Sequence, residues 1–151
     1  MSYSLIIPIF NEDRTLKKLL NKLDRISQKI EVIIVDDGST DKTKKILQTH
    51  SKSKIIIIIN EINRGKGFAI RAGVKKASKE NIILFDGDLE LNIEEIPKLI
   101  TCYENFKCDA LVGNRWGINN NSIFNFNIFG NQLVNYLFNI LFSSKYNDVL
   151  C

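Results

Sequence analysis

Three carboxylates follow one another closely in the stretch Asp86-Gly87-Asp88-Leu89-Glu90, directly after the apolar run 82–85. That run is short and rich in Ile and Phe, which is typical of a strand buried on both faces of a parallel sheet. The carboxylates would then lie at the carboxyl end of a strand, where open α/β sheets bind ligands. Two carboxylates with water and phosphate oxygens suit Mg²⁺. The pattern therefore predicts that Asp86 and Asp88 hold a divalent cation and a diphosphate, with Glu90 within reach of the same ion.

The same residues also suit a structural role. Asp-Gly-Asp is common in turns, and Asp88 or Asn92 is well placed to cap a helix that begins near Ile93. Taken alone, the triplet favours the turn. The other segments that are expected beside it favour the binding site.

Apolar segments alternate with helical patterns along the whole chain. Strands are predicted over 3–9, 31–35, 55–59, 82–85 and 109–113, and the five consecutive isoleucines of 55–59 again indicate burial on both faces. The spacing predicts helices after Asn11 or Asp13 as the cap, after Asp41, from the glycine-rich 63–67, and over 93–105. This alternation predicts an α/β fold with a doubly wound, mostly parallel sheet flanked by helices.

Polar residues follow every predicted strand, at 8–12, 36–39, 63–67, 86–90 and 114–115. Right-handed crossovers place the carboxyl ends of parallel strands at one edge of the sheet. Turn residues placed by chance would occur at both edges alike. The one-sided distribution therefore predicts a site at this edge.

The composition is that of an ordinary globular chain, with 151 residues, 44% hydrophobic and 25% charged, enough for one domain with a buried core. The net charge is +4, and most of the Lys and Arg residues recur at helical spacing. This spacing favours a solvated helix face over a face that binds a membrane. No basic patch with interleaved aromatic residues is present, so nucleic-acid binding is not expected. The three cysteines lack metal-binding spacing and indicate reduced thiols in the cytoplasm.

Five segments, taken together, resemble a known family. They are Pro8-Ile9-Phe10-Asn11-Glu12, Val35-Asp36-Asp37-Gly38-Ser39-Thr40-Asp41, Asn63-Arg64-Gly65-Lys66-Gly67, Asp86-Gly87-Asp88 and Gly113-Asn114-Arg115-Trp116. In this order and spacing they resemble the family 2 glycosyltransferases of the Rossmann-like GT-A fold. Within that family they look most like the branch with dolichyl-phosphate mannosyltransferases and bacterial polyprenyl-phosphate glycosyltransferases. The resemblance covers residues 3–151.

The resemblance implies a role for residues at each of these segments. The nucleoside of a sugar nucleotide, GDP-mannose or a UDP-sugar, is expected against Pro8, Phe10, Glu12, Val35 and Asp37. For Asp37 an N-cap or turn before the second helix is an equal alternative, and Asp36 is expected to have such a structural role.

The phosphates and the metal are implied in the same way. Asp86 and Asp88 are expected to bind Mg²⁺ or Mn²⁺, Glu90 stands where relatives place a further ligand, and Gly87 is expected to touch the nucleotide through its backbone. Two cations are expected to contact phosphates: Lys66, which lies at a glycine-rich helix start, and Arg115, whose planar guanidinium group suits that contact. A solvated lysine is nearly as good an account of Lys66.

The segment after Arg115 is expected to face the acceptor. No residue between Arg115 and Lys145 is charged, and residues 122–142 are mostly apolar with interspersed Asn and Gln. This is a poor transmembrane span, so we expect a helix packed on the catalytic domain or one in peripheral contact with a membrane. An uncharged apolar face suits a lipid-phosphate acceptor.

Asp148 matches a family position near the acceptor and is expected there as a general base, with a solvent-exposed tail residue as an even alternative. Relatives continue with further acceptor-binding residues, so we expect 1–151 to be a single domain truncated in that part, or completed by a partner chain. The expected function is metal-dependent, inverting sugar transfer to a polyprenyl-phosphate lipid at the cytoplasmic membrane face. The alternatives are a glycan hydroxyl as the acceptor, or a non-catalytic domain that binds nucleotide sugars.

Overall fold

The computed structural model describes residues 3–50, 54–106, 108–113, 136 and 138–140. The chain divides into two compact units, Met1–Ile93 and Glu94–Cys151. The first unit carries the sheet and most of the predicted site residues. Each unit is described by itself.

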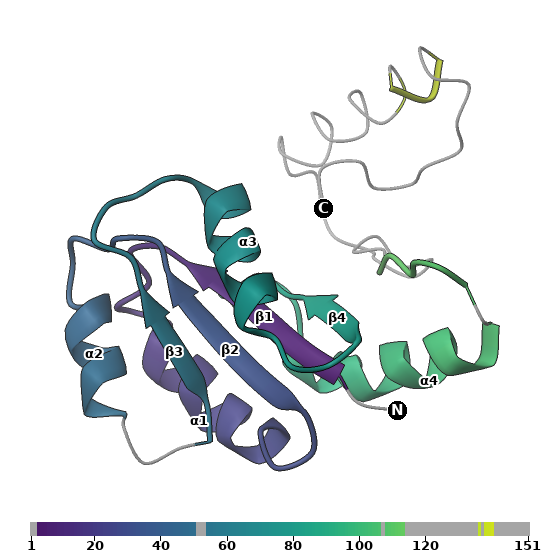
Figure 1. Ribbon diagram of the computed structural model, residues 1–151, viewed down its shortest axis with the longest axis horizontal. Helices are drawn as coiled ribbons and strands as arrows, with labels where there is room; N and C mark the ends of the chain where they lie inside the picture. The colour runs from purple at the N-terminus through teal and green to yellow at the C-terminus, as the bar shows by residue number, and fades with distance from the viewer. Residues whose placement is uncertain (1–2, 51–53, 107, 114–135, 137, 141–151) are drawn as a thin grey trace, which may run out of the picture. The chain divides into compact units, whose positions relative to one another are not determined.

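A parallel four-stranded sheet with the order β3-β2-β1-β4 forms the centre of the first unit (Figure 1). Its strands are β1 (Tyr3–Ile9), β2 (Glu31–Asp36), β3 (Ile56–Ile59) and β4 (Asn81–Leu84). Ile6 of β1 pairs with Ile33 of β2 on one side and with Leu84 of β4 on the other. The two central strands are buried along almost their whole length, as their continuous apolar runs predict.

Helices cover both faces of this sheet. In Figure 1, α3 (Lys66–Lys76) lies in front of β1 and β2, whereas α1 (Leu16–Ile26) lies behind them and contacts α2 (Thr43–Thr49). The leucines that predicted an amphipathic α1 are buried. On the opposite face Gly73 brings α3 close to the sheet, since a Cβ atom there would lie 2.5 Å from Cγ2 of Ile6. The doubly wound α/β fold is thus confirmed.

Successive strands of the parallel sheet are added first on one side of β1 and then on the other. Strands β1, β2 and β3 follow one another outward, and the crossover through α3 then returns the chain to the other side of β1, where β4 lies. Strand order therefore reverses between β1 and β4. In open α/β sheets the crevice outside the carboxyl ends at such a point is where ligands bind.

The prediction that 55–59 and 82–85 are buried on both faces is wrong. All residues of β3 are only half-buried, and on β4 Ile82 and Leu84 are 37% and 54% exposed. Among the described residues each of these strands has a neighbour on one side only. Their apolar composition resembles that of a central strand, and composition alone does not distinguish an edge from a centre.

The helix predicted over 93–105 is present as a 3₁₀ turn, η1 (Ile93–Glu95), followed by α4 (Ile96–Phe106). The strand predicted over 109–113 is absent, because residues 108–113 pair with no strand in the described part of the chain. Its apolar residue Val112 is 69% exposed. Within the described ranges, no helix is both long and apolar enough to cross a membrane.

At the amino ends of the strands, Glu31 joins three segments. Its carboxylate accepts hydrogen bonds from the hydroxyl of Ser4 on β1 and from the backbone N–H and hydroxyl of Ser78, which precedes β4. Burial opposes the charged form of Glu31, but these hydrogen bonds and the nearby charge of Lys79 outweigh it and lower the pKa. The edge of the sheet opposite the predicted site is therefore held by a charged group.

Replacing Gly73 with Ala should destabilise the protein by about 1–3 kcal/mol, the usual cost of overpacking a core. The reason is that the new Cβ atom would lie 2.5 Å from Ile6 and 3.3 Å from Val35. Urea denaturation followed by circular dichroism measures the change.

Gly67→Ala is the matched control on the same helix, because a Cβ atom at Gly67 would meet nothing within 4 Å. Helix propensity alone should leave its stability unchanged or raise it by up to about 1 kcal/mol. Equal effects of the two substitutions would contradict the packing argument.

Candidate functional site

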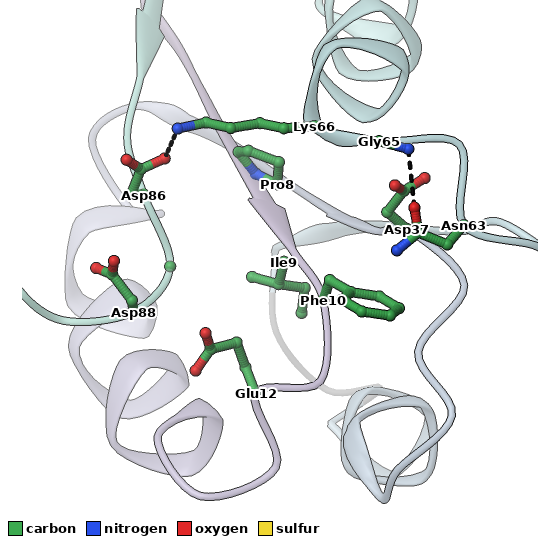
Figure 2. Close-up of a pocket in the computed structure, with 11 residues that line it drawn as sticks. Pro8, Ile9, Phe10, Glu12, Asp37, Asn63, Gly65, Lys66, Asp86 and Asp88 are labelled. Carbon is green, nitrogen blue, oxygen red and sulfur yellow. Dashed lines mark hydrogen bonds and ion pairs between the residues drawn. The ribbon is translucent and has the colours of Figure 1, made fainter. Parts of the chain in front are cut away.

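A cleft opens at the carboxyl ends of the strands, where the strand order reverses (Figure 2). Its volume of about 370 Å³ lies within the range typical of small-molecule sites. The four described segments that were predicted to meet at this edge all contribute to its wall. The lining residues are Pro8, Ile9, Phe10, Glu12, Asp37, Asn63, Gly65, Lys66, Asp86, Gly87 and Asp88.

Most of the predicted site residues in the described ranges are among these, and two are not. Val35 is fully buried and packs in the core with Ala69, so its side chain does not line the cleft. Glu90 is exposed and is not a lining residue. Arg115, Asp148 and nearly all of 122–142 lie outside the described residues.

The loop after β4 is fixed by a close contact with β1. A Cβ atom at Gly87 would lie 2.4 Å from Cγ2 of Ile9, so only glycine fits there. The next turn is closed by Asp88, whose Oδ1 accepts a hydrogen bond from the backbone N–H of Glu90 at 3.0 Å, and Leu89 has a positive φ of 64°. Turn and site are therefore compatible: Asp88 closes the turn with one oxygen while its side chain still lines the cleft.

An ion pair spans the cleft between α3 and the end of β4. Nζ of Lys66 lies 2.6 Å from Oδ1 of Asp86 (Figure 2). Lys66 is the first residue of α3, and the preceding Gly65 has a φ of 88° that favours glycine. The structure thus brings an ammonium and a carboxylate together that the sequence assigned separately, to a phosphate and to a metal.

The amino end of α3 is open toward solvent. A Cβ atom on Gly65 or Gly67 would meet nothing within 4 Å, and the first turn of the helix contains no acidic residue. The first backbone N–H groups of a helix lack intrahelical partners and attract anions. Gly65 and Asn63 complete this part of the wall. Asn63 was not singled out from the sequence, although its motif was recognised.

Asp37 is buried, with 3% of its surface exposed. Its Oδ1 accepts a hydrogen bond from Nδ2 of Asn60 at 3.1 Å, and its Oδ2 accepts one from the backbone N–H of Arg64 at 3.2 Å. The alternative of a cap or turn before α2 is therefore wrong, because the carboxylate bonds to the loop after β3. The turn role expected of Asp36 is confirmed by its bond from the backbone N–H of Ser39.

The loop after β1 is held by the loop after β2. The backbone N–H of Asn11 donates to Oγ of Ser39 at 2.8 Å, and Oδ1 of Asn11 accepts from the backbone N–H of Thr40 at 2.9 Å. Asn11 has a positive φ of 55°, which asparagine tolerates better than most residues. These bonds fix the backbone at Asn11, between Phe10 and Glu12, both of which line the cleft.

Asp41 makes a second connection between the same loops. Its Oδ2 accepts a hydrogen bond from the backbone N–H of Asp13 at 3.1 Å, and its Oδ1 accepts one from the backbone N–H of Thr43 at 2.8 Å. The prediction that Asn11 or Asp13 caps α1 is wrong, since the N-cap is Thr15. Both residues bond instead to a loop that is distant in the sequence.

The carboxylate oxygens of the cleft suit a divalent cation whose remaining coordination positions are filled by a bound ligand and water. Asp86 and Asp88 both line it, and Asp86 already faces a cationic group. In the described part of the chain no group of three or more His, Cys, Asp or Glu residues forms a fuller set of ligands. Mg²⁺ commonly binds through one or two carboxylates together with substrate phosphates and water, which matches this donor set.

Comparison with known proteins identifies the family. The model of glycosyl transferase family 2 matches residues 4–147. The chain belongs to this family. The resemblance seen in the five sequence segments is thereby confirmed.

Two curated relatives illustrate the similarity. The undecaprenyl-phosphate 4-deoxy-4-formamido-L-arabinose transferase of Proteus mirabilis is 36% identical over 108 residues, which are 67% of this chain and 33% of that protein. The dolichol-phosphate mannosyltransferase of Pyrococcus furiosus is 34% identical over 119 residues, or 77% of this chain and 34% of that protein. The chain spans about a third of the length of these two relatives.

A solved structure confirms the fold of this family member. The mannosyltransferase PcManGT from Pyrobaculum calidifontis, in complex with GDP-Man and Mn²⁺, matches with a TM-score of 0.58 and 22% sequence identity. The match covers 67% of this chain and 32% of that one. The expected GT-A fold is therefore present.

Replacing Asp41 with Ala should lower the free energy of unfolding by about 1.5–3 kcal/mol at pH 7, the usual contribution of hydrogen bonds to a charged group. Burial opposes the charged form of Asp41, but the bonds from Thr43 and Asp13 outweigh it and lower the pKa below the ordinary 3.8. The stabilisation is complete above the ordinary pKa and is lost as the pH falls through the lowered one. Urea denaturation at a series of pH values should show the two proteins converging in acid.

Glu80→Gln serves as the control, because Glu80 is an exposed carboxylate outside this network. It should match the wild type at every pH. A stability difference for Asp41→Ala that stays constant down to the most acidic condition would contradict the assigned role of the charge.

Proposed function

We propose that this glycosyltransferase moves a sugar from a nucleotide-sugar donor to a polyprenyl-phosphate lipid in a metal-dependent reaction that inverts the anomeric centre. The observation that carries the donor half of this proposal is the meeting of Asp37, Lys66, Asp86 and Asp88 in one cleft. The acceptor class is supported by the two relatives, which are named for undecaprenyl and dolichol phosphates.

The nucleoside is assigned to the β1 and β2 side of the cleft. Phe10, a residue that is 43% exposed, offers an apolar surface for a base, and Asp37 offers carboxylate oxygens to a base N–H. Figure 2 shows Asp37 on one side of β1 and the two aspartates after β4 on the other. A nucleotide would therefore extend across the end of β1, with its base toward Asp37 and its phosphates toward Asp86.

The diphosphate is assigned to the space between α3 and the end of β4. The open amino end of α3 supplies backbone N–H groups, and Lys66 supplies an ammonium. Asp86 and Asp88 would hold Mg²⁺ or Mn²⁺, which neutralises charge on a leaving diphosphate. Gly87 stands between the two carboxylates in the sequence and lines the cleft, so its backbone would contact the nucleotide.

A lipid phosphate is already ionised at neutral pH and needs no general base, whereas a sugar hydroxyl does. The lipid acceptor is therefore compatible with Asp148 as a solvent-exposed tail residue, whereas a hydroxyl acceptor would assign Asp148 as the base. We place the reaction at the cytoplasmic membrane face, with peripheral contact through 122–142. Further acceptor-binding residues would come from additional chain or from a partner chain.

Incubating the pure protein with radiolabelled GDP-mannose or UDP-glucose, Mn²⁺ and a short polyprenyl phosphate tests this function. Labelled lipid is the expected product. Product formed only with sugar acceptors would favour a glycan hydroxyl instead. Binding of nucleotide sugars without turnover on any acceptor would identify a non-catalytic domain, and absence of binding would contradict the donor site.

Replacing Asp88 with Asn should weaken Mn²⁺-dependent nucleotide binding by at least about tenfold, or 1.4 kcal/mol. The substitution removes the charge but keeps an oxygen that can accept the hydrogen bond from Glu90, so the turn should persist. Calorimetric titration with GDP and with UDP, each with and without Mn²⁺, measures the effect.

Glu61→Gln is the matched control, since Glu61 is an exposed carboxylate of the same unit that does not line the cleft. It should bind nucleotide as the wild type does. If Asp88→Asn keeps the full Mn²⁺ dependence, Asp88 is not a cation ligand.

A further inference from the structure

Lys66 and Asp86 pair with each other although each has a different ligand in the proposed function. The 2.6 Å contact joins the ammonium of Lys66 to one oxygen of a carboxylate that is assigned to the metal. Both groups are partly exposed, with side-chain exposures of 57% for Lys66 and 37% for Asp86. In this cleft the lysine therefore neutralises a charge that a cation would otherwise neutralise.

An ammonium and a divalent cation at the same carboxylate weaken each other's binding, because like charges repel at short range. The pair is exposed to solvent, and such pairs contribute little to stability. Lys66 can therefore leave Asp86 at small cost. The affinity for the cation is still lowered by the free energy of breaking the ion pair, as long as the ammonium has no other partner.

A diphosphate would supply that partner. Lys66 is the first residue of α3, so its side chain originates beside the open helix end that Gly65 and Gly67 leave free. An anion bound there would attract the ammonium away from Asp86. Each ligand thus removes an obstacle to the other, because the cation takes the carboxylate and the anion takes the ammonium.

We propose that Lys66 is an internal counter-ion that couples the binding of the cation to the binding of the diphosphate. This inference rests on the proposed function, since it takes Asp86 as a cation ligand. In the ligand-free protein Lys66 occupies Asp86 and weakens binding of the cation alone. With nucleotide present Lys66 turns to the phosphates and the cation binds more tightly, a coupling that thermodynamics requires to be reciprocal.

A lysine that serves only as a phosphate contact predicts a different result. Its removal would weaken nucleotide binding and leave the affinity for the cation alone unchanged. The counter-ion instead predicts that removal of Lys66 strengthens binding of the cation alone. The two roles are therefore separated by a measurement without nucleotide.

The test is a titration of the full chain with Mn²⁺ alone, with free Mn²⁺ followed by electron paramagnetic resonance at low ionic strength. Lys66→Met should bind Mn²⁺ about twofold to fivefold tighter than the wild type, the range expected from losing an exposed ion pair. Lys66→Arg keeps the charge and should resemble the wild type. Lys76→Met, in the last turn of the same helix, is the matched control and should also resemble it.

The titration is then repeated with saturating GDP or UDP. Nucleotide should raise the Mn²⁺ affinity of the wild type by a larger factor than that of Lys66→Met. Circular dichroism and urea midpoints establish that each variant is folded. An Mn²⁺ affinity of Lys66→Met that is equal to or below that of the wild type, or no Mn²⁺ binding by either protein, would overturn the proposal.

The two proposals can fail separately. If Mn²⁺ promotes nucleotide binding to the wild type but Lys66→Met leaves the affinity for Mn²⁺ alone unchanged, the counter-ion is wrong and the donor site stands. If Lys66→Met binds Mn²⁺ more tightly but no nucleotide binds to either protein, the ion-pair competition stands and the proposed function is wrong.

Discussion

The cleft depends on the close approach of the loop after β4 to the end of β1. A side chain at Gly87 would place its Cβ atom 2.4 Å from Ile9, so the two segments can meet only through a glycine. Ile9 belongs to a central strand that is buried and paired on both sides, which makes it a rigid support. The two aspartates that flank Gly87 are consequently held at fixed positions on the wall, whereas free loop residues would have to be ordered on binding at an entropic cost.

The other wall of the cleft depends on contacts between loops rather than on packing. Asn11 bonds to the loop after β2, and Asp37 bonds to the loop after β3. Each loop therefore satisfies polar groups of the next one. The order of these contacts follows the order of the strands, so the sheet determines which loops can support one another. The bonds of Asp37 are partly buried, so an unpaired partner there would be costly and this arrangement of the loops is favoured.

The sequence predicts the central strands and the cleft edge well because those features depend on local patterns. Continuous apolar runs identified β1 and β2, and polar residues after each strand identified the edge where Phe10, Asp37, Lys66 and Asp86 meet. Prediction from the sequence failed where a residue pairs or bonds with a residue that is distant in the chain. Edge strands β3 and β4 resemble central ones in composition, Asn11 and Asp13 resemble caps until the loop after β2 binds them, and the ion pair of Lys66 with Asp86 joins two motifs that local spacing does not relate.

Glu31 and the cleft lie at opposite ends of the same strands. Glu31 ties Ser4 to Ser78 through its carboxylate and none of these residues lines the cleft. The features that secure the sheet are thus separate from those that would choose a base or a sugar. Under the proposed function, substitutions at the loop tips would alter which donor is accepted while the anchoring end keeps the scaffold intact, a division that would let one architecture diversify in specificity without losing foldability.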